Sequence, residues 1–377
     1  MSRTIAATRS TPYDLAIIGT VGLPAGYGGF ETLAEQLVMH LGGHRQVLVV
    51  CSGKRQHSPA ERPAHFGQAD LHYIELDANG WQSIPYDIQS LWHCAPLASS
   101  LLVLGVSGCA VLPVIRRRWP QTRIVTNIDG LEWKRQKWGR LARAVLKASE
   151  AAAVRYSHAV VSDNEGIQTH VRERYGQESS LIAYGGDHVL LDERFDAGQT
   201  RFNAGTYDLA ICRIEPENNI HIILEAFSAC PTSPLILIGN WQHSDYARAL
   251  KARFGSYSNL ELKDPIYDQR RLSALRSGAR ALIHGHSAGG TNPSLVEAMN
   301  AALPVLAFDV NYNRFTTEGQ AQYWRDSAEL QSILMSSTSE RLRANARCMT
   351  EIAQRRYRWH SVAAAYDQIL FPDSFTL

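Results

Sequence analysis

The sequence lacks the long apolar segment that a membrane-spanning helix requires. No run of about 18 apolar residues occurs in the chain, and the apolar stretch over residues 94–115 is interrupted by proline, glycine and serine. Residues 1–11 are polar, without the apolar core of a signal peptide. We therefore expect a cytoplasmic protein.

Cysteine is scarce and scattered. The six cysteines include no Cys-x-x-Cys pair and lie mostly in apolar runs, which is typical of reduced core thiols and excludes a disulfide framework or a zinc ribbon. No repeat, low-complexity tract or cluster of metal ligands occurs. His284 and His286 fall on opposite sides of a strand end, so core or hydrogen-bonding roles are expected for both. We expect no metal and no cofactor.

The sequence also has no large excess of positive or negative charge, but its charged residues are unevenly distributed. The formal net charge of the 377 residues is +2, whereas residues 116–155 hold eleven Arg and Lys against Asp129, Glu132 and Glu150. Such a region could face anionic lipid, an anionic acceptor or nucleic acid. We expect no nucleic acid as a partner. We expect this basic region, and in particular the helix predicted over residues 137–156, to contact an anionic membrane surface on the inner face of the cytoplasmic membrane. A solvated surface helix is the alternative.

Strands and helices alternate along the chain, which predicts doubly wound parallel sheets. Apolar runs at residues 14–19, 47–51, 73–76, 101–105, 124–126 and 159–162 predict strands of a first sheet. The pattern restarts at residue 207, after a polar stretch over residues 190–206 that we interpret as a linker. The length fits two domains of ordinary size.

Residues 281–309 form one strand, glycine-rich loop, helix and strand. Gly289 and Gly290 allow close backbone approach, and the helix begins near Pro293 or Ser294, where the first amides lack intrahelical partners. Thr291, Asn292 and Ser294 add short polar groups, and Glu297 can accept hydrogen bonds from sugar hydroxyls. The loop suits a ligand with phosphate and sugar; an ordinary capped helix is the alternative.

A second glycine-rich loop follows the first strand. Gly26, Gly28 and Gly29 precede a helix over residues 30–41, but the spacing after Gly19 is not the Gly-x-Gly-x-x-Gly string of a nicotinamide site.

Two charged residues follow other strands. Asp129 is placed to touch an acceptor hydroxyl or to form a turn with Gly130. Arg213 suits a diphosphate, or pairs with Glu215 or Glu217.

Several of these strings resemble retaining glycosyltransferases of family 4. In that family a Glu, seven intervening residues and a second Glu precede Ala-Met and Pro-Val; Glu297-Ala298-Met299 and Pro304-Val305 match, whereas Gly289 replaces the first Glu. The string from His284 to Leu295, and Asp129 to Arg135, resemble a branch associated with rhamnosyl transfer in bacterial surface-polysaccharide synthesis. Arg213 matches the family's phosphate-binding Arg, and Asn218 replaces its Lys.

The resemblance implies an α/β protein of the GT-B fold, in which two Rossmann-like domains face a central cleft. It implies an acceptor-side domain over residues 1–195, a nucleotide-sugar domain over 196–355 and a helix over 356–377 that crosses back to the first domain. The implied catalytic residues are Asp129, Arg213 and Glu297. The implied donor-binding residues are Gly28, Gly29, Asn218, Gly289, Gly290, Thr291, Asn292 and Ser294. The implied acceptor-binding residues are Phe30, Glu31 and Glu132.

The implied reaction is transfer of a sugar, L-rhamnose from dTDP-rhamnose in particular, to a saccharide or lipid-linked saccharide. The diphosphate would bind Arg213 and the amides of residues 290–292, and Glu297 would bind the ribose. Gly289 and Asn218 leave the grip on the sugar ring open: they suit a deoxysugar or indicate reduced activity. The alternatives are a GT-B sugar epimerase or phosphorylase, and a non-catalytic protein that binds a nucleotide sugar or a partner enzyme.

Overall fold

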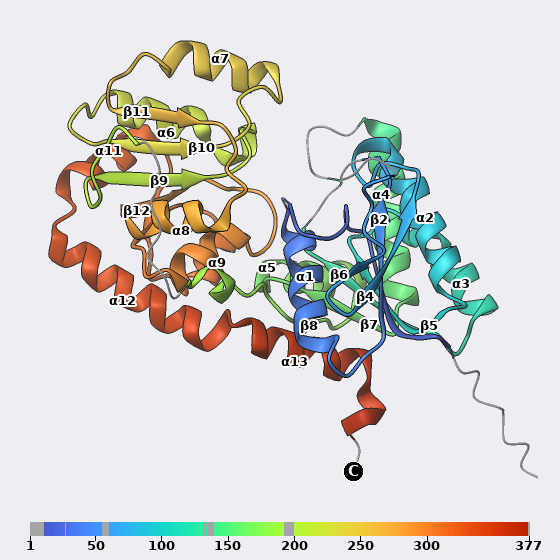
Figure 1. The fold of residues 1–377 in the computed structure, drawn as a ribbon. Coiled ribbons are helices and arrows are strands. Elements are labelled where there is room, and N and C mark those ends of the chain that lie inside the picture. The colour runs from blue at the N-terminus through green and yellow to red at the C-terminus, as the bar shows by residue number, and fades with distance from the viewer. Residues whose placement is uncertain are drawn as a thin grey trace, which may run out of the picture.

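The structure is a computed structural model that describes residues 11–26, 28–54, 60–130, 133, 139–191 and 200–375. Two parallel sheets lie side by side, each with helices on both faces (Figure 1). The first sheet lies within residues 13–181 and the second within residues 207–324. The domain limits at residues 195 and 355 stay predictions, and residues 192–199 of the predicted linker lie outside the described residues.

The first sheet has the strand order β3-β4-β2-β1-β5-β6-β7-β8, and its strand pairs are parallel except β3 with β4. Its strands are β1 (Tyr13–Ile18), β2 (Val47–Ser52), β3 (His65–Phe66), β4 (Ala69–Ile74), β5 (Ala98–Leu104), β6 (Arg123–Ile128), β7 (Ala159–Ser162) and β8 (Ser180–Leu181). Its helices are α1 (Gly29–Leu41), α2 (Ser83–Cys94), α3 (Leu112–Arg118), α4 (Arg140–Tyr156) and α5 (Glu165–Tyr175). Every residue of β2 is buried, as expected for a parallel strand covered on both faces.

The second sheet is parallel throughout, with the order β11-β10-β9-β12-β13-β14. Its strands are β9 (Tyr207–Ile211), β10 (Leu235–Ile238), β11 (Leu260–Lys263), β12 (Ala279–His284), β13 (Val305–Phe308) and β14 (Gln322–Trp324). Its helices are α6 (Ile220–Ser228), α7 (Asp245–Phe254), α8 (Gln269–Ser277), α9 (Pro293–Asn300), α10 (Asn311–Thr316) and α11 (Ser327–Ser336). Read in chain order, this is the 3-2-1-4-5-6 arrangement of a Rossmann-like domain.

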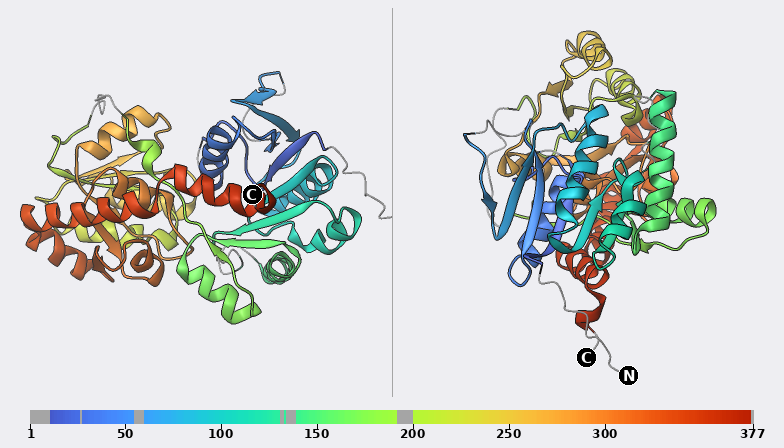
Figure 2. Two further views of the ribbon diagram at one scale, coloured as in Figure 1. Left: turned by 90° about the horizontal axis from the view of Figure 1, so that it is seen from below. Right: turned by 90° about the vertical axis from the view of Figure 1, so that its right-hand side faces the viewer.

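Two C-terminal helices join the sheets. α12 (Ser339–Arg356) runs along the second sheet, and α13 (Trp359–Leu370) continues under the first (Figures 1 and 2). Arg123 Nε donates to the carbonyl of Ile369, and Ser100 Oγ donates to that of Leu370. One hydrophobic cluster contains β1, β12, α9, α12 and α13 side chains together. The two sheets therefore share part of one core, which holds the space between them in a defined shape.

A fully buried tyrosine fixes the loop that follows β1. Tyr86 on α2 has no solvent exposure, and its hydroxyl lies 2.8 Å from the Thr20 carbonyl oxygen and 3.0 Å from that of Val50. The hydroxyl therefore ties the start of the glycine-rich loop to the neighbouring strand.

Tyr86→Phe should lower the melting temperature by about 2–6 °C, because buried carbonyl groups lose a donor worth about 1–2 kcal/mol. Scanning calorimetry measures the shift. Tyr257→Phe is the matched control, since Tyr257 is 40% exposed and should change nothing. Equal melting temperatures for Tyr86→Phe and wild type would contradict this role.

Candidate functional site

Each sheet has one point where neighbouring strands connect to opposite sides, and ligands of open parallel sheets bind at the carboxyl ends of strands there. In the second sheet this point lies between β9 and β12, whose ends lead to Arg213 and to the loop before α9. In the first sheet it lies between β1 and β5, whose ends lead to Gly19 and Gly105. Both points border cavities.

A cavity of about 230 Å³ lies between the two domains. The predicted catalytic and donor-binding residues all line it: Gly28, Gly29, Asp129, Arg213, Asn218, Gly289, Gly290, Thr291, Asn292, Ser294 and Glu297. Sequence positions almost 270 residues apart, such as Gly28 and Glu297, therefore share one space. The structure brings the glycine-rich loop before α1 into one cavity with Arg213 and the loop before α9.

The N-terminus of α1 is suited to an anion. Gly28 precedes the helix with φ 144°, a conformation that favours glycine, and gives no side-chain cap to the first amides. A Cβ on Gly28 would lie 1.8 Å from Glu31 Oε2, so only glycine fits there. Gly28, Gly29 and the exposed Arg213 border the same cavity. A helix N-terminus and a guanidinium thus approach one space from different domains.

The hydrogen bonds of the loop before α9 differ from the prediction. The amides of Gly290 and Thr291, expected to bind a diphosphate, donate instead to the first domain: Gly290 N to the Asp129 carbonyl at 3.0 Å, and Thr291 N to Asp163 Oδ2 at 2.8 Å. Asn292 caps α9, because its Oδ1 accepts from Ser294 N at 3.0 Å and from Ser294 Oγ at 2.8 Å. This end of α9 is occupied by protein acceptors, because it lies at the domain contact.

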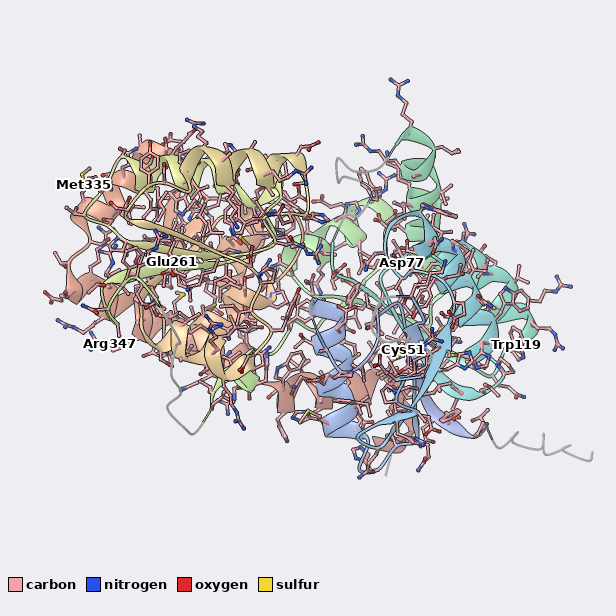
Figure 3. The ribbon with its side chains drawn as sticks, turned by 45° about the horizontal axis from the view of Figure 1, so that its top comes forward. Cys51, Asp77, Trp119, Glu261, Met335 and Arg347 are labelled. Atoms are coloured by element: carbon pink, nitrogen blue, oxygen red, sulfur yellow. The ribbon has the colours of Figure 1, made fainter. Side chains whose placement is uncertain are left out.

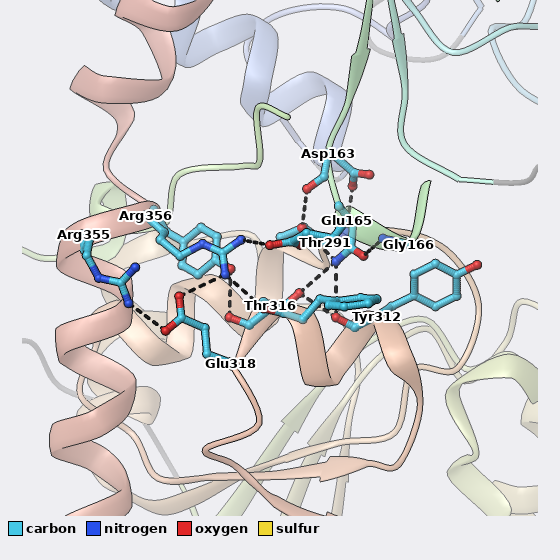
Figure 4. A network of polar contacts seen from close by, with 12 residues as sticks. Asp163, Glu165, Gly166, Thr291, Tyr312, Thr316, Glu318, Arg355 and Arg356 are labelled. Carbon is cyan, nitrogen blue, oxygen red and sulfur yellow. Dashed lines mark hydrogen bonds and ion pairs between the residues drawn. The ribbon is translucent and has the colours of Figure 1, made fainter. Parts of the chain in front are cut away.

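A buried polar network extends that contact (Figure 4). Thr291 Oγ1 donates to the Asp163 carbonyl at 2.6 Å, and Asn164 Nδ2 reaches the Tyr312 carbonyl at 3.3 Å. Glu165 and Arg356 form an ion pair at its edge. Burial, with the Asp129 charge nearby, raises the pKa of Asp163 well above its usual range. The network joins β7 and α5 of the first domain to α10 and α12 of the second.

Glu297 is held rigidly in the cavity wall. Its Oε2 pairs with Arg276 on α8, and its Oε1 lies 3.4 Å from His188 Nε2. Burial works to raise the pKa of Glu297, but Arg276 and His188 together outweigh it and hold the pKa below its ordinary value. Glu297 therefore stays an ionised acceptor beside the cavity.

Asn218, which replaces the Lys of the resembled family, makes its polar contacts within the second domain. Its Nδ2 donates to the Arg213 carbonyl at 2.8 Å, and its Oδ1 lies 2.7 Å from His286 Nδ1. The side chain shapes the turn that presents Arg213. His284 is buried, and burial together with His286 lowers its pKa to about 3, which agrees with a neutral core histidine.

A second cavity of about 160 Å³ adjoins the α1 N-terminus and is lined mostly by first-domain residues. Phe30 and Glu31 line it, together with Gly28, Gly29, Asp129 and Arg213. Glu31 is buried and accepts from Val21 N at 2.7 Å, and burial raises its pKa. Its side chain thus fixes the glycine-rich loop as well as bordering the cavity. Glu132, also expected to bind the acceptor, lies outside the described residues.

Three buried residues at these cavities were not predicted from sequence. Arg276 and Tyr184 line the interdomain cavity, and Asp87 lines the second cavity. Among the described residues, the Tyr184 hydroxyl and Arg276 Nη1 have no hydrogen-bond partner. Arg276 lies on a charge-rich helix that reads as surface, and Tyr184 and Asp87 carry no motif, so local sequence gives no signal for them. Within the described part of the chain, no group of three or more potential metal ligands gathers.

Asp87 gives a test of the second cavity. Burial raises the pKa of Asp87 to about 8, against a hydrogen bond from the Gly108 amide. The group therefore contributes stability below its ordinary pKa, and that stability is lost as the pH rises through about 8.

Between pH 6 and pH 9 the wild type should lose about 2 kcal/mol more stability than Asp87→Asn, which has no proton to release there. Thermal melting across this range measures the difference. Asp245→Asn is the control, because Asp245 lies on the surface of α7. Parallel pH curves for wild type and Asp87→Asn would show that the carboxyl is already ionised at neutral pH.

Comparison with known proteins gives one family match. Residues 13–187 match the model of a domain of unknown function, DUF1972. No curated protein matches the sequence.

Solved structures match over nearly the whole chain. Sucrose-phosphate synthase (tll1590) from Thermosynechococcus elongatus is 17% identical, with a TM-score of 0.75, over 96% of this chain and 99% of that one. Anabaena Alr3699/HepE, in complex with UDP, is 14% identical, with a TM-score of 0.69, over 95% and 100%. The N-terminal domain of Candida albicans trehalose-6-phosphate phosphatase is 12% identical, with a TM-score of 0.67, over 99% and 98%. The predicted GT-B fold, two Rossmann-like domains facing a cleft, is confirmed.

Proposed function

We propose that the chain is a glycosyltransferase that takes a sugar from a nucleotide diphosphate donor. The observation that carries the proposal is the shared cavity: Arg213 from one Rossmann-like domain and the α1 N-terminus from the other line one space. The HepE structure of the same fold holds UDP. A nucleotide diphosphate is the ligand whose negative charge both groups suit.

In this proposal the diphosphate lies between Arg213 and the amides at Gly28 and Gly29. Positive charge and oriented amides stabilise the departing nucleotide diphosphate as the bond to the sugar breaks. Glu297, an ionised acceptor, takes a hydrogen bond from the nucleoside ribose. We propose further that the reaction needs no metal, because Arg213 and the helix amides balance the negative charge of the diphosphate.

The acceptor would occupy the second cavity, which Phe30, Glu31 and Asp129 border. Asp129 borders both cavities, and in this proposal it contacts the acceptor hydroxyl. Our specific proposal is a retaining transfer of L-rhamnose from dTDP-rhamnose to a saccharide or lipid-linked saccharide of a bacterial surface polysaccharide. It rests on the sequence resemblance.

Arg213→Ala should reduce the release of nucleotide diphosphate from the accepted sugar nucleotide by about 100-fold or more, because one charge-assisted contact to the leaving group is lost. A panel of sugar nucleotides, with and without saccharide acceptors and EDTA, measures release and transfer. Arg248→Ala is the control, since Arg248 is half-exposed on α7 and pairs with Asp245.

Full activity of Arg213→Ala would contradict its assigned role. If the wild-type protein binds a nucleotide sugar but neither hydrolyses it nor transfers its sugar, the result would support the non-catalytic alternative. Conversion of the donor sugar without transfer would identify the epimerase alternative.

We also propose that the basic region meets anionic lipid. α3 ends in Arg116, Arg117 and Arg118 and packs beside α4, which carries Arg140, Arg143, Lys147 and Arg155. Val114 is 52% exposed next to them. Figure 3 places Trp119, just after α3, at the end of the first domain remote from the second. Lys134, Arg135 and Lys137 lie outside the described residues.

The protein should sediment with vesicles that contain anionic lipid and not with neutral vesicles, and added salt should release it. Arg117→Glu with Arg118→Glu should abolish sedimentation, because both exposed charges are reversed. Arg253→Glu with Lys251→Glu, on α7 of the second domain, is the matched control. Absence from anionic vesicles at low salt would contradict the proposal. No described helix is long and apolar enough to cross a bilayer.

A further inference from the structure

Arg276 is a buried guanidinium in the wall of the interdomain cavity. It is 4% exposed, lies in the last turn of α8 and borders the cavity beside Leu272 and Ile266. A permanently charged group in such a place is costly unless its donors are used. The chain uses only part of them.

The known partner of Arg276 is Glu297, which contacts Nη2. Nη1 is buried and has no hydrogen-bond partner among the described residues. An unused buried donor on a cation is uncommon, and a bound ligand is one way to complete its hydrogen bonding. Arg276 Nη1 is therefore a donor that the described part of the chain leaves unsatisfied.

The position of Arg276 is fixed by a chain of contacts that reaches the crossing helix. Trp359 Nε1, on α13, donates to His188 Nδ1 at 2.9 Å. Because Nδ1 accepts, the His188 proton lies on Nε2, which faces Glu297 Oε1 at 3.4 Å. Glu297 is thus held from both sides, and the Arg276 guanidinium paired with it cannot rotate freely.

The chemistry of this corner differs from that near Arg213. Glu297 neutralises Arg276, so the remaining N–H groups suit an uncharged oxygen rather than a phosphate. Leu272 and Ile266 give the neighbouring wall an apolar surface suited to a flat base. An oxygen of a nucleoside, either a pyrimidine carbonyl or a ribose hydroxyl, meets both conditions.

We infer that Arg276 binds the nucleoside end of the donor through Nη1 and positions Glu297 beside it. This inference rests on the proposed function and deepens it, because it assigns the two ends of the ligand. Arg213 and the α1 N-terminus take the diphosphate, and the Arg276–Glu297 pair takes the nucleoside.

Titration calorimetry with UDP, dTDP and inorganic pyrophosphate separates the two ends. Arg276→Lys keeps a positive charge beside Glu297 but lacks the planar guanidinium. It should therefore lower the affinity for the nucleotide about tenfold, which corresponds to the loss of one hydrogen bond to a charged group. It should leave pyrophosphate binding unchanged, whereas Arg213→Ala should weaken pyrophosphate binding.

Arg280→Lys is the matched control. Arg280 also pairs with a buried carboxylate, with Nε 2.9 Å from Asp208 Oδ1, but it does not border the cavity. It should bind every probe as wild type does. Arg276→Gln, which keeps a donor toward Glu297, is the second variant if Arg276→Lys does not fold, and it should show the same selective loss.

Wild-type nucleotide affinity in a folded Arg276 variant would overturn the inference alone. An equal loss of nucleotide and pyrophosphate binding would also overturn it, because Arg276 would then act at the phosphate end. A wild type that binds neither nucleotide would overturn the proposed function, and the inference with it.

Discussion

The contact between the loop before α9 and the strand ends of the first domain sets the geometry of the whole site. Two backbone amides, at Gly290 and Thr291, donate to the Asp129 carbonyl and to the Asp163 carboxyl group. A Cβ on Gly290 would lie 2.0 Å from Asp163 Oδ1, so glycine is required for this approach. Since α12 and α13 carry part of the core across both sheets, the two domains are held at a spacing that leaves a cavity between their strand ends.

That contact also bears on where our proposal places the diphosphate. The Gly290 and Thr291 amides donate to the first domain and the Ser294 amide donates to Asn292, so our proposal places the diphosphate at the α1 N-terminus and Arg213 instead. Gly289 has φ 115°, where an L side chain is strained. The backbone at this position therefore suits glycine and disfavours the Glu that the sequence resemblance would place there.

Much of this could be predicted from the sequence, because strong periodic segments and special loop residues determine it. The strands β1, β2, β9 and β13 and the helices α1, α6 and α9 follow apolar patterns with clear ends, and loops at strand ends bring distant motifs together. The strand predicted over residues 73–76 is instead β4, Ala69–Ile74, because pairing with β2 sets its register. Which amides are consumed at the domain contact, and which buried donors such as Arg276 Nη1 stay unused, depends on packing between segments that local sequence does not encode.

A crystal structure of the protein with a bound nucleotide diphosphate tests most directly whether both domains bind one ligand. We predict a diphosphate between the Arg213 guanidinium and the amides at Gly28 and Gly29, so that both domains contact one ligand. A diphosphate bound to a single domain, or at a site away from this cavity, would contradict the account.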